Sequence, residues 1–277
     1  MLEQRTVCHM KTDYRFIQLG FGPPMVFLHG SYATTSTWKK MVEQLALHYH
    51  CILIELPGHG GTPDPDDFSA PTIETELSLV KHIVTEITDQ PIHLVGHSYG
   101  GVVALVLAMD GRLAVSEMTL FEPVAVWVLD KVYDLQYIEC LRTFLIKYRR
   151  DVRQNIPHCC GEVINFWGGE GVFEQLPDFI KDSMEPMVHN NIRHWDVCSA
   201  IGNSPPDLHN CLVPTRIVCG TRSNPIAHAI AEGLDRQMRR SKKYAIEDAT
   251  HFLVTSHADE CVRVVQEPPF CMGDVVG

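Results

Sequence analysis

The sequence predicts an α/β protein with a mostly parallel, doubly wound sheet and a helical segment inserted between two strands. Three observations support this fold class. Short apolar runs alternate several times with amphipathic helical patterns, which is typical of a parallel sheet covered on both faces. One apolar run ends in Gly-His-Ser-Tyr-Gly, a pattern of strand, sharp turn and helix. About 90 residues separate two later strands, far more than the usual connection in α/β units.

The composition is that of a globular protein with an acidic surface. Among 277 residues, 45% are hydrophobic and 21% are charged, and the formal net charge is −11. A chain of this length can bury a large core in one α/β domain with an insertion, and we expect a monomer or a homodimer. The negative charge disfavours a nucleic acid partner, because such proteins bind phosphates through basic surfaces.

The sequence also bears on location and cofactors. The first residues are charged and no apolar run follows them, so we expect no secretory signal. No segment approaches the roughly 18 apolar residues of a membrane span. The ten cysteines are scattered without a Cys-x-x-Cys pair, which favours reduced thiols and a cytoplasmic location. The fifteen histidines show no metal-binding spacing on a predicted helix, so we expect neither a metal nor a cofactor.

The first part of the chain predicts alternating strands and helices. Helical spacing of apolar residues indicates one helix over residues 37–49, with Ser36 as its N-cap, and another over 71–87. A further apolar helix over 101–109 ends at a helix-stop signal, Asp110-Gly111. Strands are expected at residues 14–19, 25–28, 51–56 and 92–95.

The second part continues the alternation after a long helical insertion. The insertion is expected to be helical near residues 131–150 and 176–194, and it contains Trp127, Trp167 and Trp195. We therefore expect an α/β domain formed by residues 1–122 and 212–277, with a helical subdomain at 123–211. A helix at 225–240 and a last helix ending near residue 266 complete the pattern, and the remaining strands are expected at 118–122, 212–220 and 244–247.

The Gly96-His97-Ser98-Tyr99-Gly100 segment predicts a turn that presents a serine. The serine at such a turn adopts a strained backbone, and side chains two residues to either side would collide with neighbouring backbone. Gly96 and Gly100 remove those side chains. We interpret Ser98 as a nucleophile, and the alternative is a structural turn with an unreactive serine.

Four motifs in this order resemble those of the α/β-hydrolase family. His29-Gly30 resembles the oxyanion-hole loop of the family, Pro57-Gly58-His59-Gly60 the loop after the next strand, and residues 96–100 the nucleophile elbow. His251 follows the last strand, where the family has its catalytic histidine. The resemblance covers about residues 14–266 and implies that the helical insertion is a cap domain.

The sequence departs from the family at the catalytic acid. The family usually has this acid three residues after the glycine that ends the seventh strand, and Ser223 is at that position here. Some members supply the acid from the end of the sixth strand, which implies Glu122. Asp248, three residues before His251, is the alternative, and another acid or none is also left open.

The resemblance implies a serine hydrolase of the carboxylesterase type that acts through an acyl-enzyme. Ser98 would attack the substrate, His251 would transfer the proton, and the N–H groups of Ser31 and Tyr99 would stabilise the oxyanion. The implied substrate is a small, partly apolar molecule with a carboxylic ester or related acyl bond. Hydrolysis of lactones, thioesters or C–C bonds, perhydrolysis, a non-catalytic ligand receptor and a scaffold whose cap binds a protein partner remain alternatives. The residues expected to bind the substrate are His29, Gly30, Tyr32, His97, Trp127 and Trp167.

Overall fold

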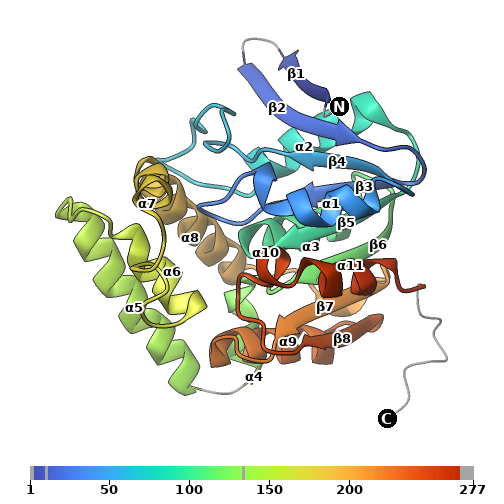
Figure 1. Ribbon diagram of the computed structural model, residues 1–277. Helices are drawn as coiled ribbons and strands as arrows, with labels where there is room; N and C mark the ends of the chain where they lie inside the picture. The colour runs from blue at the N-terminus through green and yellow to red at the C-terminus, as the bar shows by residue number, and fades with distance from the viewer. Residues whose placement is uncertain (1–2, 10–11, 133–134, 269–277) are drawn as a thin grey trace.

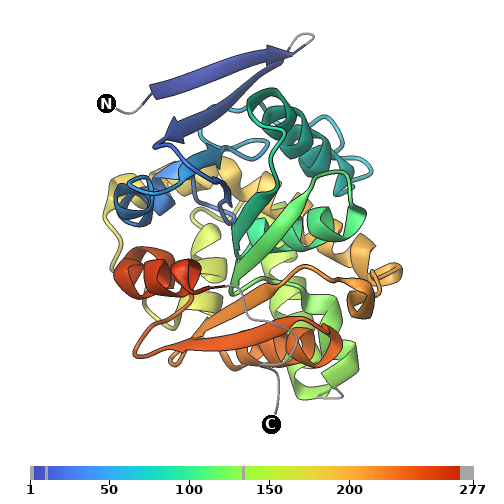
Figure 2. The same ribbon diagram turned by 90° about the vertical axis from the view of Figure 1, so that its right-hand side faces the viewer.

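A computed structural model describes residues 3–9, 12–132 and 135–268. Within these residues, an eight-stranded sheet has the order β1-β2-β4-β3-β5-β6-β7-β8 (Figures 1 and 2). The pairs β1–β2 and β2–β4 are antiparallel and the other five are parallel, which confirms the predicted fold class. The strands are β1 (Glu3–His9), β2 (Thr12–Leu19), β3 (Pro24–Leu28), β4 (His50–Ile54), β5 (Ile92–His97), β6 (Val115–Phe121), β7 (Thr215–Gly220) and β8 (Ser241–Ile246).

Helices cover both faces of the sheet because apolar side chains extend from each face. One group of buried residues joins the sheet to α1, α10 and α11, and a second joins it to α2, α3 and α9. Amphipathic patterns in the sequence place the buried faces of α2, α9 and α11, whereas α3 is apolar on nearly all sides and is buried accordingly. The helices outside the insertion are η1 (Thr35–Trp38), α1 (Lys39–Leu45), α2 (Glu74–Ile87), α3 (Tyr99–Asp110), α9 (Pro225–Gln237), α10 (Leu253–Ser256) and α11 (Ala258–Gln266).

In the described part of the segment between β6 and β7, the regular secondary structure consists of helices joined by turns and loops. Helices α5 to α8 lie together beside the sheet (Figure 1). The amphipathic α5 and α6 contribute side chains to the core that also contains α3 and α9. The elements of this segment are η2 (Val126–Val128), α4 (Leu129–Val132), α5 (Leu135–Arg153), α6 (Cys160–Gly168), α7 (Asp178–Met184), η3 (Glu185–Met187), α8 (Val188–Asn203) and η4 (Leu208–Asn210).

Several elements differ from the sequence-based expectations. Strand β1 and helix α6 lie outside the predicted elements. The first helix begins with a 3-10 turn whose N-cap is Thr34, not Ser36, because the Thr34 hydroxyl accepts the N–H of Ser36 at 3.3 Å. The helix expected over 176–194 is divided into α7 and α8 at Pro186, which lacks an amide hydrogen and interrupts the helical hydrogen bonds.

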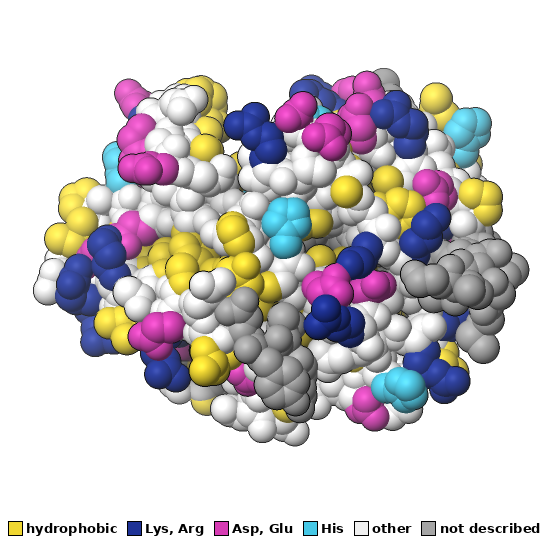
Figure 3. Space-filling view, turned by 90° about the horizontal axis from the view of Figure 1, so that it is seen from below, with side chains coloured by type: hydrophobic (Ala, Val, Ile, Leu, Met, Phe, Trp, Pro, Cys, Tyr) yellow, Lys and Arg dark blue, Asp and Glu magenta, His cyan; other side chains and the backbone are white. Residues whose placement is uncertain are grey.

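The molecular surface carries charges of both signs. On the face seen in Figure 3, acidic and basic side chains are interspersed rather than separated by sign. No helix in the described part of the chain combines the length and the apolar character needed to cross a bilayer.

Candidate active site

Ser98 lies at a sharp turn between β5 and α3. Its backbone angles are φ 54° and ψ −118°, a conformation that is strained for a residue with a side chain. The two flanking glycines are required by close backbone packing. A Cβ atom at Gly96 would lie 2.4 Å from the carbonyl oxygen of Gly100, and one at Gly100 would lie 2.2 Å from that of Leu28. The turn therefore depends on both glycines of the sequence motif.

His251 and Glu122 form a buried hydrogen-bonded pair. The Nδ1 atom of His251, in the loop after β8, lies 2.8 Å from Oε2 of Glu122, which follows β6. The other carboxylate oxygen accepts the N–H of Gly220 at 2.8 Å and the hydroxyl of Ser223. Burial alone would raise the pKa of Glu122, but the hydrogen bonds from His251, Ser223 and Gly220 lower this pKa to about 2. Glu122 is therefore an anion that holds the imidazole of His251.

The alternative acid lies elsewhere. Asp248 is exposed, and its backbone N–H donates to the hydroxyl of Thr221 at 2.9 Å. Ser223, at the usual position of the acid in the family, donates a hydrogen bond to Glu122. The geometry thus brings Glu122 to the imidazole, with Ser223 as its hydrogen-bond donor.

His97 supports the backbone of His251. Its Nε2 atom lies 2.8 Å from the carbonyl oxygen of His251, and because a carbonyl only accepts, this nitrogen carries the hydrogen. Burial lowers the pKa of His97 to about 3, with the neighbouring His251 as a further cause, so His97 is neutral. The indole of Trp167 stacks on the His251 ring at 5.3 Å between centroids. Together these contacts restrict the orientation of His251.

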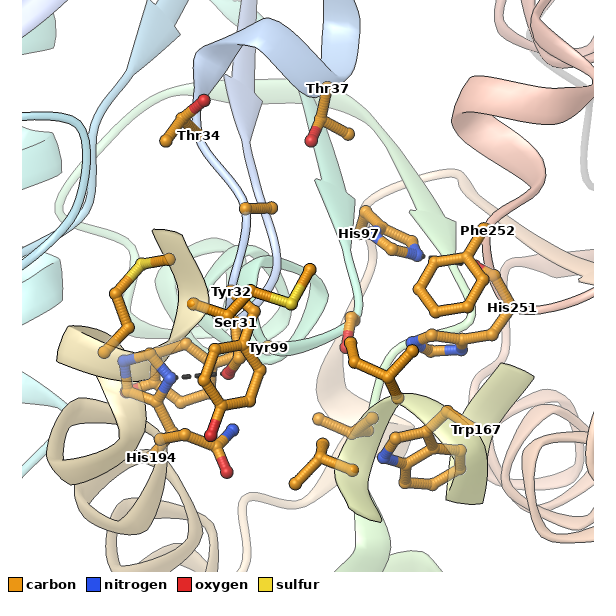
Figure 4. Close-up of a pocket in the computed structure, with 18 of the residues that line it drawn as sticks. Ser31, Tyr32, Thr34, Thr37, His97, Tyr99, Trp167, His194, His251 and Phe252 are labelled. Atoms are coloured by element: carbon orange, nitrogen blue, oxygen red, sulfur yellow. Dashed lines mark hydrogen bonds between the residues drawn. The ribbon is translucent and has the colours of Figure 1, made fainter. Parts of the chain in front are cut away.

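Ser98 and His251 line a cavity of about 780 Å³ (Figure 4). The loops at the carboxyl ends of the strands form one part of its wall, and helices α6 to α8 form much of the rest. Of the residues that the structure describes, no Lys, Arg, Asp or Glu lines this cavity. Its apolar wall includes Val163, Ile164, Trp167, Leu176, Ile180 and Met184.

The predicted oxyanion-hole residues both lie in the cavity wall with Ser98. Ser31 is in the loop after β3, directly after Gly30. Tyr99 is the first residue of α3, so its N–H has no carbonyl partner one turn earlier in that helix. A helix N-terminus also favours a negative charge.

The predicted substrate-binding residues are divided between the cavity wall and the core. Tyr32, His97 and Trp167 are in the wall. The other three, His29, Gly30 and Trp127, are not among the described residues that line the cavity, so the prediction is wrong for them. The His29 ring is fully buried and accepts the N–H of Leu56 at 3.1 Å, while Trp127 packs in the core of buried apolar residues.

His194 on α8 also lines the cavity, although it was not among the residues predicted from the sequence. No local motif marks this histidine, because only the packing of α8 on the core brings it to the cavity. Among the described residues there is also no group of three or more His, Cys, Asp or Glu side chains placed to hold a metal ion.

A mostly parallel sheet, a serine at the turn after β5 and a buried acid–histidine pair define the class of α/β hydrolases. The chain belongs to the alpha/beta hydrolase family, whose model matches residues 25–264.

Proteins named as esterases and lipases are similar to this chain in sequence. The chain is 24% identical over 261 residues to the pimeloyl-[acyl-carrier protein] methyl ester esterase of Methylococcus capsulatus, covering 90% of this chain and 95% of that protein. A monoacylglycerol lipase of Xenopus laevis is 23% identical, covering 92% of this chain and 79% of that protein. With the Aeromonas salmonicida pimeloyl-[acyl-carrier protein] methyl ester esterase, the identity is 36%, but the match spans only 33% of this chain and 34% of that protein. The structure of MenH from S. aureus superposes with a TM-score of 0.71 at 22% identity, covering 91% of this chain and 96% of that chain.

Proposed function

We propose that the protein is a serine hydrolase that cleaves carboxylic esters with a neutral, apolar acyl group. The observation that carries this proposal is the buried hydrogen bond between Glu122 and His251, because His251 lines an apolar cavity together with Ser98. The names of two relatives that match over most of the chain, a methyl ester esterase and a monoacylglycerol lipase, support ester cleavage.

The mechanism follows from the roles of the three side chains. Ser98 attacks the ester carbonyl while Nε2 of His251 takes its proton, and Glu122 keeps Nδ1 protonated and stabilises the imidazolium. The backbone N–H groups of Ser31 and Tyr99 stabilise the oxyanion. The tetrahedral intermediate expels the alcohol, which receives the proton from His251. Water then hydrolyses the acyl-enzyme by the same proton transfers in the second half-reaction.

The cavity wall supports a neutral acyl group. A carboxylate, phosphate or ammonium group would lose its hydration there without an ionic partner among the described lining residues. Two of the lining histidines, His97 and His194, have pKa values lowered by burial and are neutral. We expect an ester with a terminal carboxylate on its acyl chain to have a kcat/KM at least about tenfold below that of its neutral isostere, because burying an unpaired charge is costly. Equal kcat/KM values would contradict this substrate class.

We further propose that residues 123–211 form a cap over a core of residues 1–122 and 212–277. The helical character of the described elements in this segment supports the division. Side chains of α6 and α7 contribute to the apolar cavity wall, as expected of a cap that selects the acyl group.

Labelling with a fluorophosphonate probe tests the proposed nucleophile. We expect the wild type to be labelled and to hydrolyse p-nitrophenyl esters, whereas Ser98→Ala does neither. Ser116→Ala is a matched control, because Ser116 belongs to β6 and its hydroxyl donates to the carbonyl of Ile92 at 3.0 Å. If the wild type is neither labelled nor active, the proposal is wrong and a ligand receptor of this fold is favoured.

We also propose a reducing, cytoplasmic location. The eight cysteines from Cys51 to Cys261 are free thiols. Protein isolated with immediate thiol blocking should then show all ten cysteines of the sequence in the reduced form by mass spectrometry. Disulfide-linked peptides in that protein would contradict this location.

A further inference from the structure

Helix α8 is attached to the α/β core through buried polar contacts. Arg193 on α8 has a side chain that is only 1% exposed, and it forms ion pairs with Glu76 of α2 and with Asp67. Its Nη2 atom lies 2.7 Å from Oδ2 of Asp67. Nearly one turn earlier, Nδ2 of Asn190 donates to Oδ1 of Asp64 at 2.8 Å. Because removing one partner of a buried ion pair is strongly unfavourable, these contacts hold α8 in one position.

The residue after Arg193 contacts two separate parts of the active site. His194 Nδ1 lies 2.6 Å from the hydroxyl oxygen of Ser31, the contact drawn as a dashed line in Figure 4. The imidazole also stacks on the ring of Tyr99, with centroids 3.7 Å apart and an interplanar angle of 10°. The ring of His59 stacks on His194 as well, at 5.4 Å and 13°. One side chain from α8 therefore touches both the loop after β3 and the start of α3.

Ser31 and Tyr99 are the two residues whose N–H groups would stabilise the oxyanion. They come from different segments, so their relative position depends on the packing between those segments. Catalysis by such donors requires a fixed arrangement, because a displaced N–H stabilises the developing charge less well. The His194 side chain contacts the side chains of both Ser31 and Tyr99.

The imidazole of His194 acts as a neutral group. Burial lowers its pKa well below the ordinary value, and the nearby His59, Arg193 and His29 lower it further. A neutral ring can share a hydrogen bond with the Ser31 hydroxyl, and it adds no positive charge to the cavity wall.

We propose that His194 is a positioning residue that fixes the oxyanion hole, through its hydrogen bond to Ser31 and its stacking on Tyr99. This inference rests on the proposed hydrolase function. The oxyanion exists in the tetrahedral intermediate and not in the bound ester, so His194 supports the transition state more than substrate binding. Loss of its hydrogen bond should accordingly lower kcat and leave KM nearly unchanged.

A double-mutant cycle tests the proposal. His194→Phe keeps an aromatic ring against Tyr99 and removes the hydrogen bond, whereas Ser31→Ala removes the hydroxyl and keeps the backbone N–H. We expect each variant to lower kcat at least about tenfold, with KM within about threefold, because a whole oxyanion donor contributes about 10²–10³ in kcat. Because both substitutions remove one interaction, the double variant should be no slower than the slower single variant.

Two further measurements separate positioning from a general structural effect. Binding of a trifluoromethyl ketone, which forms a tetrahedral adduct with the serine, should weaken by the factor by which kcat falls. Val197→Ala is the control, since Val197 is fully buried on the same helix and is not a lining residue of the cavity. This control should lower the thermal midpoint without lowering kcat.

A folded His194→Phe variant with the kcat of the wild type would overturn the proposal. The proposal would also be overturned if kcat of the double variant fell by the product of the two factors measured for His194→Phe and Ser31→Ala. If His194→Phe does not fold, Ser31→Ala alone remains decisive, because an unchanged kcat in that variant contradicts the role of the hydrogen bond. Failure of the hydrolase function itself is distinguishable, because the wild type would then lack both ester hydrolysis and fluorophosphonate labelling.

Discussion

The Nδ1 atom of His251 lies 2.8 Å from Oε2 of Glu122, although the two residues are 129 positions apart in the sequence. Strand β7 lies between β6, which Glu122 follows, and β8, which precedes His251. The Glu122 carboxylate extends to Gly220, the last residue of β7, and accepts its N–H at 2.8 Å. A Cβ atom at Gly220 would lie 2.3 Å from the carbonyl oxygen of Ala249 and 2.9 Å from Oγ of Ser223. The glycine at the end of β7 therefore allows the loop after β8 to approach the acid.

Replacing the acid should slow the chemical step. In Glu122→Gln, the amide no longer stabilises the imidazolium of His251, and we expect kcat to fall by up to about 10⁴-fold, as for the acid of other triads. Ser223→Ala removes one hydrogen bond to a carboxylate that keeps its others, so its kcat should fall less than about tenfold. Asp248→Asn is the matched control and should leave kcat unchanged. A large loss in Asp248→Asn, with full activity in Glu122→Gln, would reverse the assignment of the acid.

Removing the imidazole of His97 should reduce activity through the backbone of His251. His97→Phe keeps a buried ring and removes the hydrogen bond to the His251 carbonyl oxygen. We expect kcat to fall about tenfold, because a small displacement of a catalytic group has a large effect on rate. Because the pKa of His97 is lowered to about 3, the pH–rate profile between pH 5 and pH 8 should keep its shape. Loss of an ionisation from that profile would show that His97 itself titrates in the reaction.

The Glu122–His251 pair should make folding stability depend on pH in acid. The pKa of Glu122 is about 2 in the folded protein and about 4.3 in an unfolded chain, so the folded state holds fewer protons on this group. Its contribution to stability is complete above about pH 4.3 and is lost as the pH falls toward 2. Urea unfolding should therefore show a steeper loss of stability below pH 5 in the wild type than in Glu122→Gln. Equal slopes would show that the pKa of Glu122 is not lowered by folding.

The buried ion pairs of Arg193 should contribute strongly to stability. In Arg193→Met, the carboxylate of Glu76 remains buried without its partner, and we expect a loss of about 3–5 kcal/mol in the free energy of unfolding. The control is Arg149→Met, because Arg149 on α5 also pairs with a residue of α8, Asp196, at 2.8 Å but is partly exposed. This control should cost about 0–1 kcal/mol. A similar loss of unfolding free energy in both variants would show that the buried ion pairs of Arg193 contribute no more to stability than the partly exposed pair of Arg149.

Local patterns predicted most of the secondary structure, and the exceptions have physical causes. The apolar runs of β3, β4 and β5 are buried along most of their length, so composition alone marked them as strands. Strand β1 was not predicted, because its sequence, Glu-Gln-Arg-Thr-Val-Cys-His, has no apolar run. Pro186 itself indicates a break between α7 and α8, but one continuous helix was predicted because the sequence on both sides of the proline is helical in character.

The sequence by itself determined the fold class and the strand-turn-helix at Ser98, because both depend on residues close together in the chain. Only the tertiary structure decided which acid lies next to His251 and which side chains line the cavity. Contacts between residues far apart, such as His251 with Glu122 and His194 with Ser31, depend on the strand order and on the packing of α8 against the core. Glu122 was inferred from a resemblance, and no pattern in the sequence marked His194.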